Sequence, residues 1–245
     1  MPVAQLIDPS TQAESMAYPA PFTTARGAVT TKFAQPDGFL QWVVTGELAG
    51  GAEIEWTGEH GDEAVYVVQG RLQVGDEVCP AGGAVIVESG APATARALEN
   101  TQIVHMGSSV PTAPDDGPLG PPEPTGHGVH VVGPQGLGAS KDSDAFATKT
   151  SFYSRGRCPT CRIMFYRVRG EGDTYSHSHS EAQLQHVLDG SIKVGGFTVD
   201  AGMTFAVPSD YRYGYRSPEP WEIVVYRRDV SLMRRHPKDE PHLEG

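Results

Sequence analysis

The sequence is short of cysteine, of positive charge and of long apolar runs. The three cysteines, Cys79, Cys158 and Cys161, are too few and too odd in number for a disulfide framework. Lys and Arg number 19 against 30 Asp and Glu, and the net charge of -11 argues against nucleic acid, whose phosphates need a basic surface. No apolar run approaches the roughly 18 residues that cross a bilayer, and no signal-peptide pattern opens the chain. We therefore expect a soluble cytoplasmic protein that binds neither nucleic acid nor membrane.

Helix-forming runs are also scarce, whereas the chain contains 29 glycines and 20 prolines. Short apolar stretches between turn residues are typical of a mostly β architecture. Hydrophobic residues make up 38% of the 245, enough to build one large β domain or two smaller ones.

An internal repeat decides between these two arrangements. Residues 67–75 (VVQGRLQVG) match residues 187–195 (VLDGSIKVG) without gaps, at an offset of 120 given by Gly70 and Gly190. At the same offset the segment from Ala81 resembles the segment from Ala201. Two segments that keep one register across the turns between them indicate a duplicated fold. Many short strands with regular turns predict barrels or double-sheet jelly rolls.

The repeat also suggests the domain boundaries. The stretch from Ser108 to about Gly138 is rich in Pro, Gly, Ser and Asp, a composition that predicts a linker. Short strand signals at 41–44 and 163–168 precede the two repeat cores. We predict an N-terminal domain over 1–107, a linker over 108–140, a C-terminal domain over 141–235 and a tail over 236–245.

The segment 172–183 (GDTYSHSHSEAQ) carries the most chemical information. His177 and His179 are two residues apart, so on a strand both side chains point to one face. Two neutral imidazoles on one face make half of a site for a transition metal. Gln183 follows four positions after His179, and six residues then lead to Gly190, where a tight turn is expected.

This pattern resembles the cupin superfamily, whose first motif is G-x5-H-x-H-x3-4-E-x6-G. The second cupin motif, G-x5-P-x-G-x2-H-x3-N, resembles the segment from Gly202 through Pro208, and its histidine falls on Tyr213. Together with the repeat, the chain looks like a bicupin. The resemblance implies two tandem jelly-roll barrels with a divalent transition metal (Fe, Mn, Zn or Ni) deep inside one of them, and it allows a homo-oligomer.

Two positions depart from the cupin pattern. Gln183 stands where a Glu ligand is usual, and its carbonyl oxygen can still coordinate a metal. Tyr213 stands where a third His is usual. A phenol is a weak ligand unless it is deprotonated, and a nearby divalent ion can lower its pKa. Tyr213 is therefore expected as a fourth ligand or as a catalytic acid or base, and the alternative is that it lines the pocket without coordinating.

Other polar side chains are expected to line a pocket for a small organic ligand. Gln185 shares the face of Gln183 and is a second catalytic candidate. Tyr211 and Tyr215 share the face of Tyr213 if the stretch is extended, and the alternative is simple packing at the barrel mouth. Three arginines are candidates to bind a substrate carboxylate: Arg162, Arg167 and Arg212.

The first repeat lacks the histidines. The 120-residue offset places Thr57, Glu59, Glu63 and Ala93 at its ligand positions, so this copy is interpreted as structural. His60 lies one residue off the motif and would point away. The single C-x-x-C at Cys158 and Cys161 has no second pair for a zinc site and no βαβ context for redox work, and we interpret it as structural or incidental.

Because His177, His179 and Gln183 carry no charge, a metal that they held would keep its full charge and act as a strong Lewis acid. This favours non-redox chemistry on a small polar organic acid or carbonyl compound: isomerisation, elimination or ring opening. Two alternatives stay open, an Fe-dependent cupin dioxygenase and a non-catalytic metabolite-binding bicupin.

Overall fold

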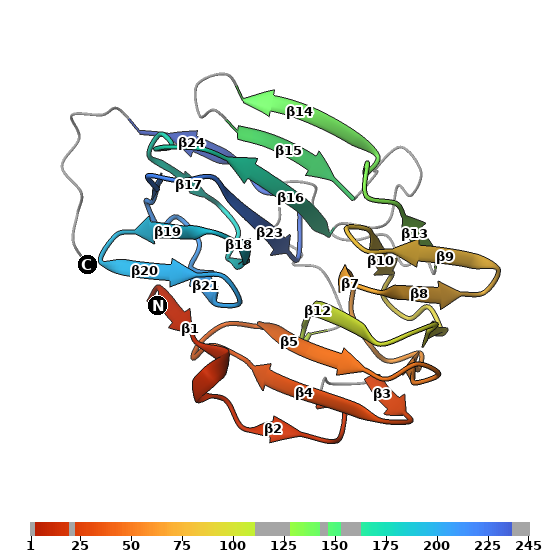
Figure 1. Ribbon diagram of the computed structural model, residues 1–245. Coiled ribbons are helices and arrows are strands. Elements are labelled where there is room, and N and C mark those ends of the chain that lie inside the picture. The colour runs from red at the N-terminus through yellow and green to blue at the C-terminus, as the bar shows by residue number, and fades with distance from the viewer. Residues whose placement is uncertain (1–2, 20–22, 111–127, 143–146, 153–162, 237–245) are drawn as a thin grey trace.

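The computed structural model is an almost entirely β protein, as Figure 1 shows. It describes residues 3–19, 23–110, 128–142, 147–152 and 163–236. The predicted fold class, all-β with two tandem jelly-roll barrels, is confirmed. No helix in these ranges is long and apolar enough to cross a membrane.

The first barrel is built from a seven-stranded and a five-stranded sheet. Their strand orders are β13-β10-β7-β12-β5-β4-β2 and β3-β6-β11-β8-β9. The strands are β2 (Glu14–Ser15), β3 (Thr23–Arg26), β4 (Val29–Ala34), β5 (Gln41–Leu48), β6 (Glu53–Trp56), β7 (Glu63–Gln69), β8 (Arg71–Val74), β9 (Glu77–Pro80), β10 (Ala84–Val87), β11 (Ala93–Ala97), β12 (Thr101–Ser108) and β13 (Val129–Val132).

The second barrel has a seven-stranded sheet in the order β1-β21-β18-β23-β16-β15-β14, a three-stranded sheet β20-β19-β22 and the pair β17-β24. Its strands are β1 (Gln5–Ile7), β14 (Gly138–Asp142), β15 (Ala147–Ser151), β16 (Met164–Gly170), β17 (His177–His179), β18 (Gln183–Asp189), β19 (Ser191–Val194), β20 (Phe197–Asp200), β21 (Thr204–Val207), β22 (Tyr215–Arg216), β23 (Trp221–Arg227) and β24 (Met233–Arg235). One short 3-10 helix, η1 (Pro9–Thr11), follows β1.

The 120-residue offset of the sequence repeat is present in the strand register. In the first barrel Ala64 pairs with Met106, and in the second Leu184 pairs with Tyr226. Gly70 and Gly190 both have positive φ, at 82° and 74°, where a residue with a side chain would be strained. A Cβ at either glycine would also collide with the backbone of the returning strand, so the tight turn expected at Gly190 needs glycine.

Two strands lie outside the predicted boundaries. β1, near the N-terminus, pairs with β21 of the second barrel, as Figure 1 shows. β13 lies within the segment predicted as linker, and it pairs with β10 at an edge of the first barrel. Residues 111–127, which hold most of the Pro- and Gly-rich stretch, lie outside the described residues, so the domain limits stay a prediction.

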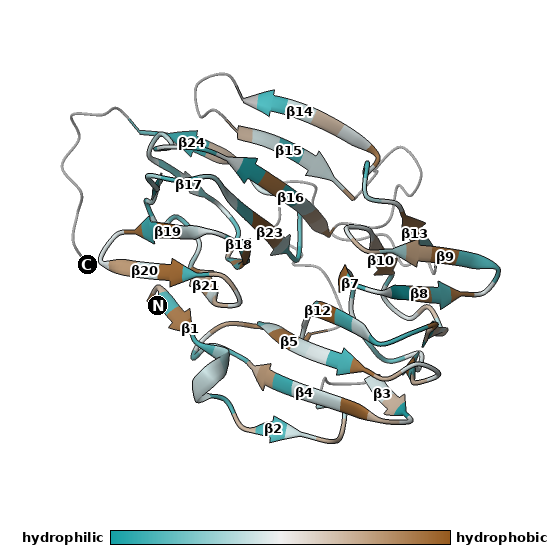
Figure 2. Ribbon diagram, viewed as in Figure 1, coloured by the Kyte–Doolittle hydropathy of each residue, from teal (hydrophilic) through white to brown (hydrophobic). Residues whose placement is uncertain are grey.

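Strand alternation assigns each residue of the large sheets to one of two faces. In the second barrel Tyr166, Val225 and Phe205 point inward, in a cluster that fills the barrel. Phe165 and Tyr226 point outward, in a cluster that also contains first-barrel residues and joins the two barrels. Figure 2 shows that β2 and β24, by contrast, are mostly hydrophilic.

Candidate functional site

The two histidines of the motif lie side by side on β17. Both are 8% exposed, and their ring centroids are 5.1 Å apart with the rings nearly perpendicular. β17 pairs with β24 on one side, and on the other His177 and Tyr213 exchange backbone hydrogen bonds of 2.8 and 2.9 Å. The backbone therefore holds both imidazoles and the Tyr213 phenol in one place.

Both imidazoles are held in the neutral form that binds metals. Burial lowers the pKa of His177 to about 4 and that of His179 to about 2, and the positive charge of Arg227 adds to both shifts. The Nδ1 atom of His177 lies 3.1 Å from the carbonyl oxygen of Tyr175, which can only accept a hydrogen bond. His177 Nδ1 therefore carries the proton, and its Nε2 lone pair remains for a metal.

His179 is positioned by a strained turn. The Asp210 amide donates a 2.6 Å hydrogen bond to the His179 carbonyl oxygen. Asp210 has a φ of 59°, and in the second cupin motif this position is a glycine. Aspartate is one of the few other residues that tolerate the left-handed region, so the local geometry survives the substitution.

Tyr213 is 3% exposed, and its ring centroid lies 4.3 Å from that of His177. Its hydroxyl oxygen accepts a 2.6 Å hydrogen bond from Nε2 of Gln183. Burial raises the pKa of Tyr213 to about 12, although the charge of Arg227 opposes part of that shift. The phenol therefore keeps its proton at neutral pH, which favours a proton-donating role over coordination as a phenolate.

Gln183 is fully buried on β18, and its side-chain oxygen already has two donors. Arg227, opposite it on β23, donates from Nε at 2.9 Å and from Nη2 at 2.6 Å. Both lone pairs of that oxygen are used, so Gln183 would coordinate a metal only after leaving Arg227.

Whether a metal fits this site depends on which side-chain atoms are available to coordinate it. His179 Nδ1 is buried and has no hydrogen-bond partner, and the His177 Nε2 lone pair is oriented by Tyr175. The described ranges contain no group of three His, Cys, Asp or Glu side chains that could hold a metal. The histidine pair therefore fits a transition metal, and the third position depends on Gln183 or on a substrate atom.

Gln185 and Tyr215 also lie inside the second barrel. Gln185 is fully buried on the inward face of β18, and neither its amide oxygen nor its amide nitrogen has a partner. Tyr215 is 6% exposed and packs between Tyr213 and Trp221, with ring centroids 5.7 and 5.1 Å away. Tyr211 is half-buried and packs against the same cluster.

The structure does not bring the three candidate arginines together. Arg167 follows the inward-facing Tyr166 on β16, so it points outward. Its guanidinium donates to Tyr66 Oη at 3.2 Å and to the carbonyl oxygens of Gly82 and Pro134 at 3.3 and 3.0 Å, which links the barrels. Arg212 is half-buried, and its Nε donates to Ser176 Oγ at 2.8 Å. Arg162, like Cys158 and Cys161, lies outside the described residues.

Two cations that the sequence analysis did not single out do face the interior. Arg227 is 2% exposed, and its Cζ lies 5.3 Å from the ring centroid of Tyr166. Lys149 on β15 places its Nζ 3.9 Å from the centroid of the same ring. The alternation of β23, in which Trp221, Ile223 and Val225 point inward, would have indicated Arg227 in advance.

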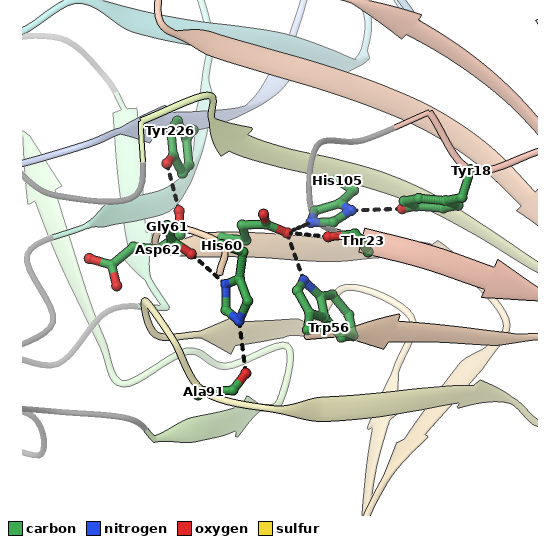
Figure 3. A network of polar contacts seen from close by, with 10 residues as sticks. Tyr18, Thr23, Trp56, His60, Gly61, Asp62, Ala91, His105 and Tyr226 are labelled. Atoms are coloured by element: carbon green, nitrogen blue, oxygen red, sulfur yellow. Dashed lines mark hydrogen bonds and ion pairs between the residues drawn. The ribbon is translucent and has the colours of Figure 1, made fainter. Parts of the chain in front are cut away.

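In the first barrel a network of polar side chains surrounds His105 and Trp56, as Figure 3 shows. Oε2 of the fully buried Glu63 accepts from Trp56 Nε1 at 2.6 Å and from Thr23 Oγ1 at 3.2 Å, and lies 2.8 Å from His105 Nε2. His105 Nδ1 in turn lies 2.7 Å from the Tyr18 hydroxyl.

The other three residues at the ligand positions of the first barrel are not buried with Glu63. Thr57 and Glu59 are exposed, and Ala93 is half-buried. His60 is buried, with its ring nitrogens 2.7 and 2.8 Å from the carbonyl oxygens of Gly61 and Ala91. Of the four positions, Glu63 is fully buried and hydrogen-bonded in the interior.

Comparison with known proteins supports the fold. No protein-family model matches the chain, and no curated protein sequence matches it. Among solved structures, oxalate decarboxylase of Lactobacillus farciminis in a formate complex has a TM-score of 0.70 at 12% identity, covering 94% of this chain and 88% of that one. A serine-to-alanine mutant of Bacillus subtilis oxalate decarboxylase has a TM-score of 0.67 at 13% identity over 94% and 78% of the two chains.

A Pseudomonas aeruginosa protein described as glyoxylate-induced has a TM-score of 0.68 at 17% identity, covering 94% of this chain and 91% of that one. These are cupin-fold proteins. The chain has their fold. At such low identity the similarity says nothing of the reaction, which has to be argued from the site.

Proposed function

We propose that the second barrel is the active site of a metal-dependent enzyme that acts on a small polar organic acid or carbonyl compound. The reaction we infer is non-redox: isomerisation, elimination or ring opening. One observation carries this proposal. Two buried, neutral imidazoles, His177 and His179, lie beside the protonated phenol of Tyr213 inside the second barrel.

The residues divide the work as follows. His177 and His179 would hold a divalent transition metal, which when bound would polarise a carbonyl or carboxylate oxygen of the substrate. Tyr213 holds its proton at the hydroxyl, next to His177, and can deliver it to charge that develops on the substrate. The amide of Gln185 has a donor and an acceptor free to orient the substrate.

The first test is the metal content of protein purified without chelators. We expect about one equivalent in the wild type and a large loss in the His177→Ala/His179→Ala variant. His130→Ala is the matched control, because His130 is part-exposed and pairs with Glu88 in the first barrel. Equal metal content in all three proteins would refute the site.

The second test is turnover, assayed with and without oxygen on a panel of small carboxylic and keto acids. Oxalate belongs in the panel because two of the fold neighbours are oxalate decarboxylases. Anaerobic turnover that needs the metal supports the proposal. Turnover that strictly requires oxygen and Fe(II) would instead identify a dioxygenase.

A non-catalytic metabolite-binding protein is the second candidate, and the contact between Gln183 and Arg227 favours it. That contact occupies the predicted third ligand with a cation, so without a metal these side chains already form a hydrogen-bonded polar cluster that can bind a ligand. A binding protein would retain its ligand in the His177→Ala variant and turn over no acid in the panel.

A further inference from the structure

We propose that Arg227 and Lys149 form an anion subsite inside the second barrel that binds a small dicarboxylate. The inference deepens the proposed function and rests on it, because it names the substrate class of the same site. It stands on a fully buried Arg227 and a half-buried Lys149 that have no acidic partner among the described residues, on the Gln185 amide in the same barrel interior, and on a contrast with the first barrel.

Arg227 is among the largest fully buried side chains of the molecule. A guanidinium has five N–H donors. Two of them reach the neutral oxygen of Gln183, and Nη1 lies 3.9 Å from the sulfur of Met164. No carboxylate pairs with Arg227 in the ranges that the structure describes. Its charge is therefore uncompensated by any carboxylate of the described residues.

Lys149 adds a second positive charge close by. Its Nζ lies 3.9 Å and the Arg227 Cζ 5.3 Å from the Tyr166 ring centroid, so the two charges are no more than about 9 Å apart, a separation that a small dicarboxylate can bridge. The ring attracts cations but does not neutralise them. Within the described part of the chain Lys149 likewise has no acidic partner. Burial and the nearby charge of Arg227 lower the pKa of Lys149 to about 8, so it is mostly charged at neutral pH.

Burying two like charges together is costly unless an opposite charge compensates them. Because the described residues supply no such charge here, we assign it to a ligand. Arg227 suits a carboxylate, because the planar fork of its N–H groups matches two carboxylate oxygens. Gln185 lies two residues after Gln183 on the same face of β18. The nitrogen and oxygen of its side-chain amide have no hydrogen-bond partner. Two cations call for two negative charges, which points to a dicarboxylate over a monocarboxylate.

The first barrel shows what the same position looks like without a ligand. The 120-residue offset places Gly107 where the second barrel has Arg227. A Cβ on Gly107 would run into the Trp42 ring, so the indole fills the space that the guanidinium occupies in the other barrel. The positive interior therefore belongs to the second barrel alone and is not required by the fold.

The experiment uses full-length protein stripped of metal with a chelator, so that anion binding is measured apart from metal chemistry. Malonate, its uncharged analogue malonamide, acetate and sulfate are titrated calorimetrically in a buffer free of carboxylate and phosphate. We expect malonate to bind, acetate to bind at least tenfold more weakly, and malonamide not to bind. Sulfate that binds more tightly than malonate would overturn the carboxylate assignment.

The variants locate the site. Arg227→Met is expected to weaken malonate binding at least tenfold and Lys149→Met at least threefold, with Arg227→Lys recovering part of the loss. Arg216→Met and Lys193→Met remove the same charges from exposed positions of this barrel, and each should change the affinity less than twofold. Equal weakening by the exposed variants would show a general charge effect and overturn the subsite.

Further measurements distinguish a failure of the anion subsite from a failure of the metal centre. If Arg227→Met does not fold, the Lys149→Met variant and the rise in Tm of wild-type protein with malonate decide the question. Absence of malonate binding in folded, metal-free wild type refutes the anion subsite but leaves the metal centre standing. Unchanged metal content in the His177→Ala/His179→Ala variant refutes the metal centre but leaves the anion subsite standing.

Discussion

Arg227 donates two hydrogen bonds, of 2.9 and 2.6 Å, to the side-chain oxygen of Gln183. Each residue lies on the strand next to the other, and both are buried. Gln183 stands where the cupin motif has a glutamate. A glutamate there would form a buried ion pair with Arg227, whereas the glutamine leaves the arginine charge free for a ligand.

Replacing Arg227 should strengthen metal binding. In Arg227→Met the carbonyl oxygen of Gln183 is released and a full positive charge near the metal position is removed. We expect the affinity for Mn²⁺ or Zn²⁺ to rise at least tenfold, about 1.4 kcal/mol. Competition with a chromophoric chelator measures it, with Arg216→Met as the control. Unchanged affinity in a folded Arg227→Met protein would show that Gln183 and Arg227 do not compete with the metal.

Removing the Tyr213 hydroxyl should affect turnover more than binding. Tyr213→Phe keeps the ring against His177 but deletes the proton that burial keeps on the phenol. We expect kcat to fall by about 10² to 10⁴ while metal content and KM change little. Steady-state kinetics on the acid that is turned over tests this. A loss confined to KM would assign Tyr213 to binding.

Anion binding should depend on the protonation of Lys149. The amine is charged below its pKa of about 8 and neutral above it, so malonate affinity should be highest at pH 7 and decline as the pH rises through 8 to 9. The groups near Lys149 are Tyr166, whose pKa is raised by burial, and the guanidinium of Arg227. Calorimetry across this range should show a flat profile in Lys149→Met, and an equal decline in that variant would contradict the assignment.

His186 should make the fold sensitive to acid. Burial lowers its pKa to about 4, and Nδ1 lies 2.9 Å from Thr204 Oγ1. Between pH 6.5 and 4 the unfolded chain binds a proton that the folded chain rejects, so stability is present above pH 6.5 and falls as the pH drops through this window. The difference corresponds to about 3 kcal/mol. Urea unfolding of metal-free His186→Asn should show a smaller loss between pH 6.5 and 4 than the wild type.

The Glu63 network should stabilise the first barrel without serving the second. Glu63→Gln removes the charge that accepts from Trp56 and Thr23 and faces His105. We expect unfolding to cost about 2 to 4 kcal/mol less, measured by urea denaturation. Metal content and malonate binding should not change in the folded variant. Loss of either would show that the first barrel contributes directly to the site.

The architecture could be predicted from the sequence because the repeated residues form the same turns and strand pairs in both barrels. The turns at Gly70 and Gly190 and the pairing of β7 with β12 and of β18 with β23 follow the 120-residue offset. The positions of β1 and β13 were not predictable in this way. Each pairs with a distant strand, and a short apolar segment does not specify its partner.

The site was predictable only in part, for a similar reason. The spacing of His177 and His179 fixes their common face, and the structure shows both buried there. Alternation from Gln183 would also have excluded Arg167 from the interior and indicated Arg227, had it been extended along β16 and β23. Lys149 carries no such signal, because its neighbourhood depends on how β15 packs beside β16.

The pairing of β1 with β21 has a consequence for how the protein is synthesised. Gln5 meets Ala206, so the two partners leave the ribosome roughly 200 residues apart, at rates of about 5–20 residues per second. The strands of the first barrel can pair before β21 is synthesised, and until then β1 has no partner strand. The second barrel therefore closes last, and β1 stays unpaired for about 10 to 40 seconds, during which its free edge is available to a chaperone.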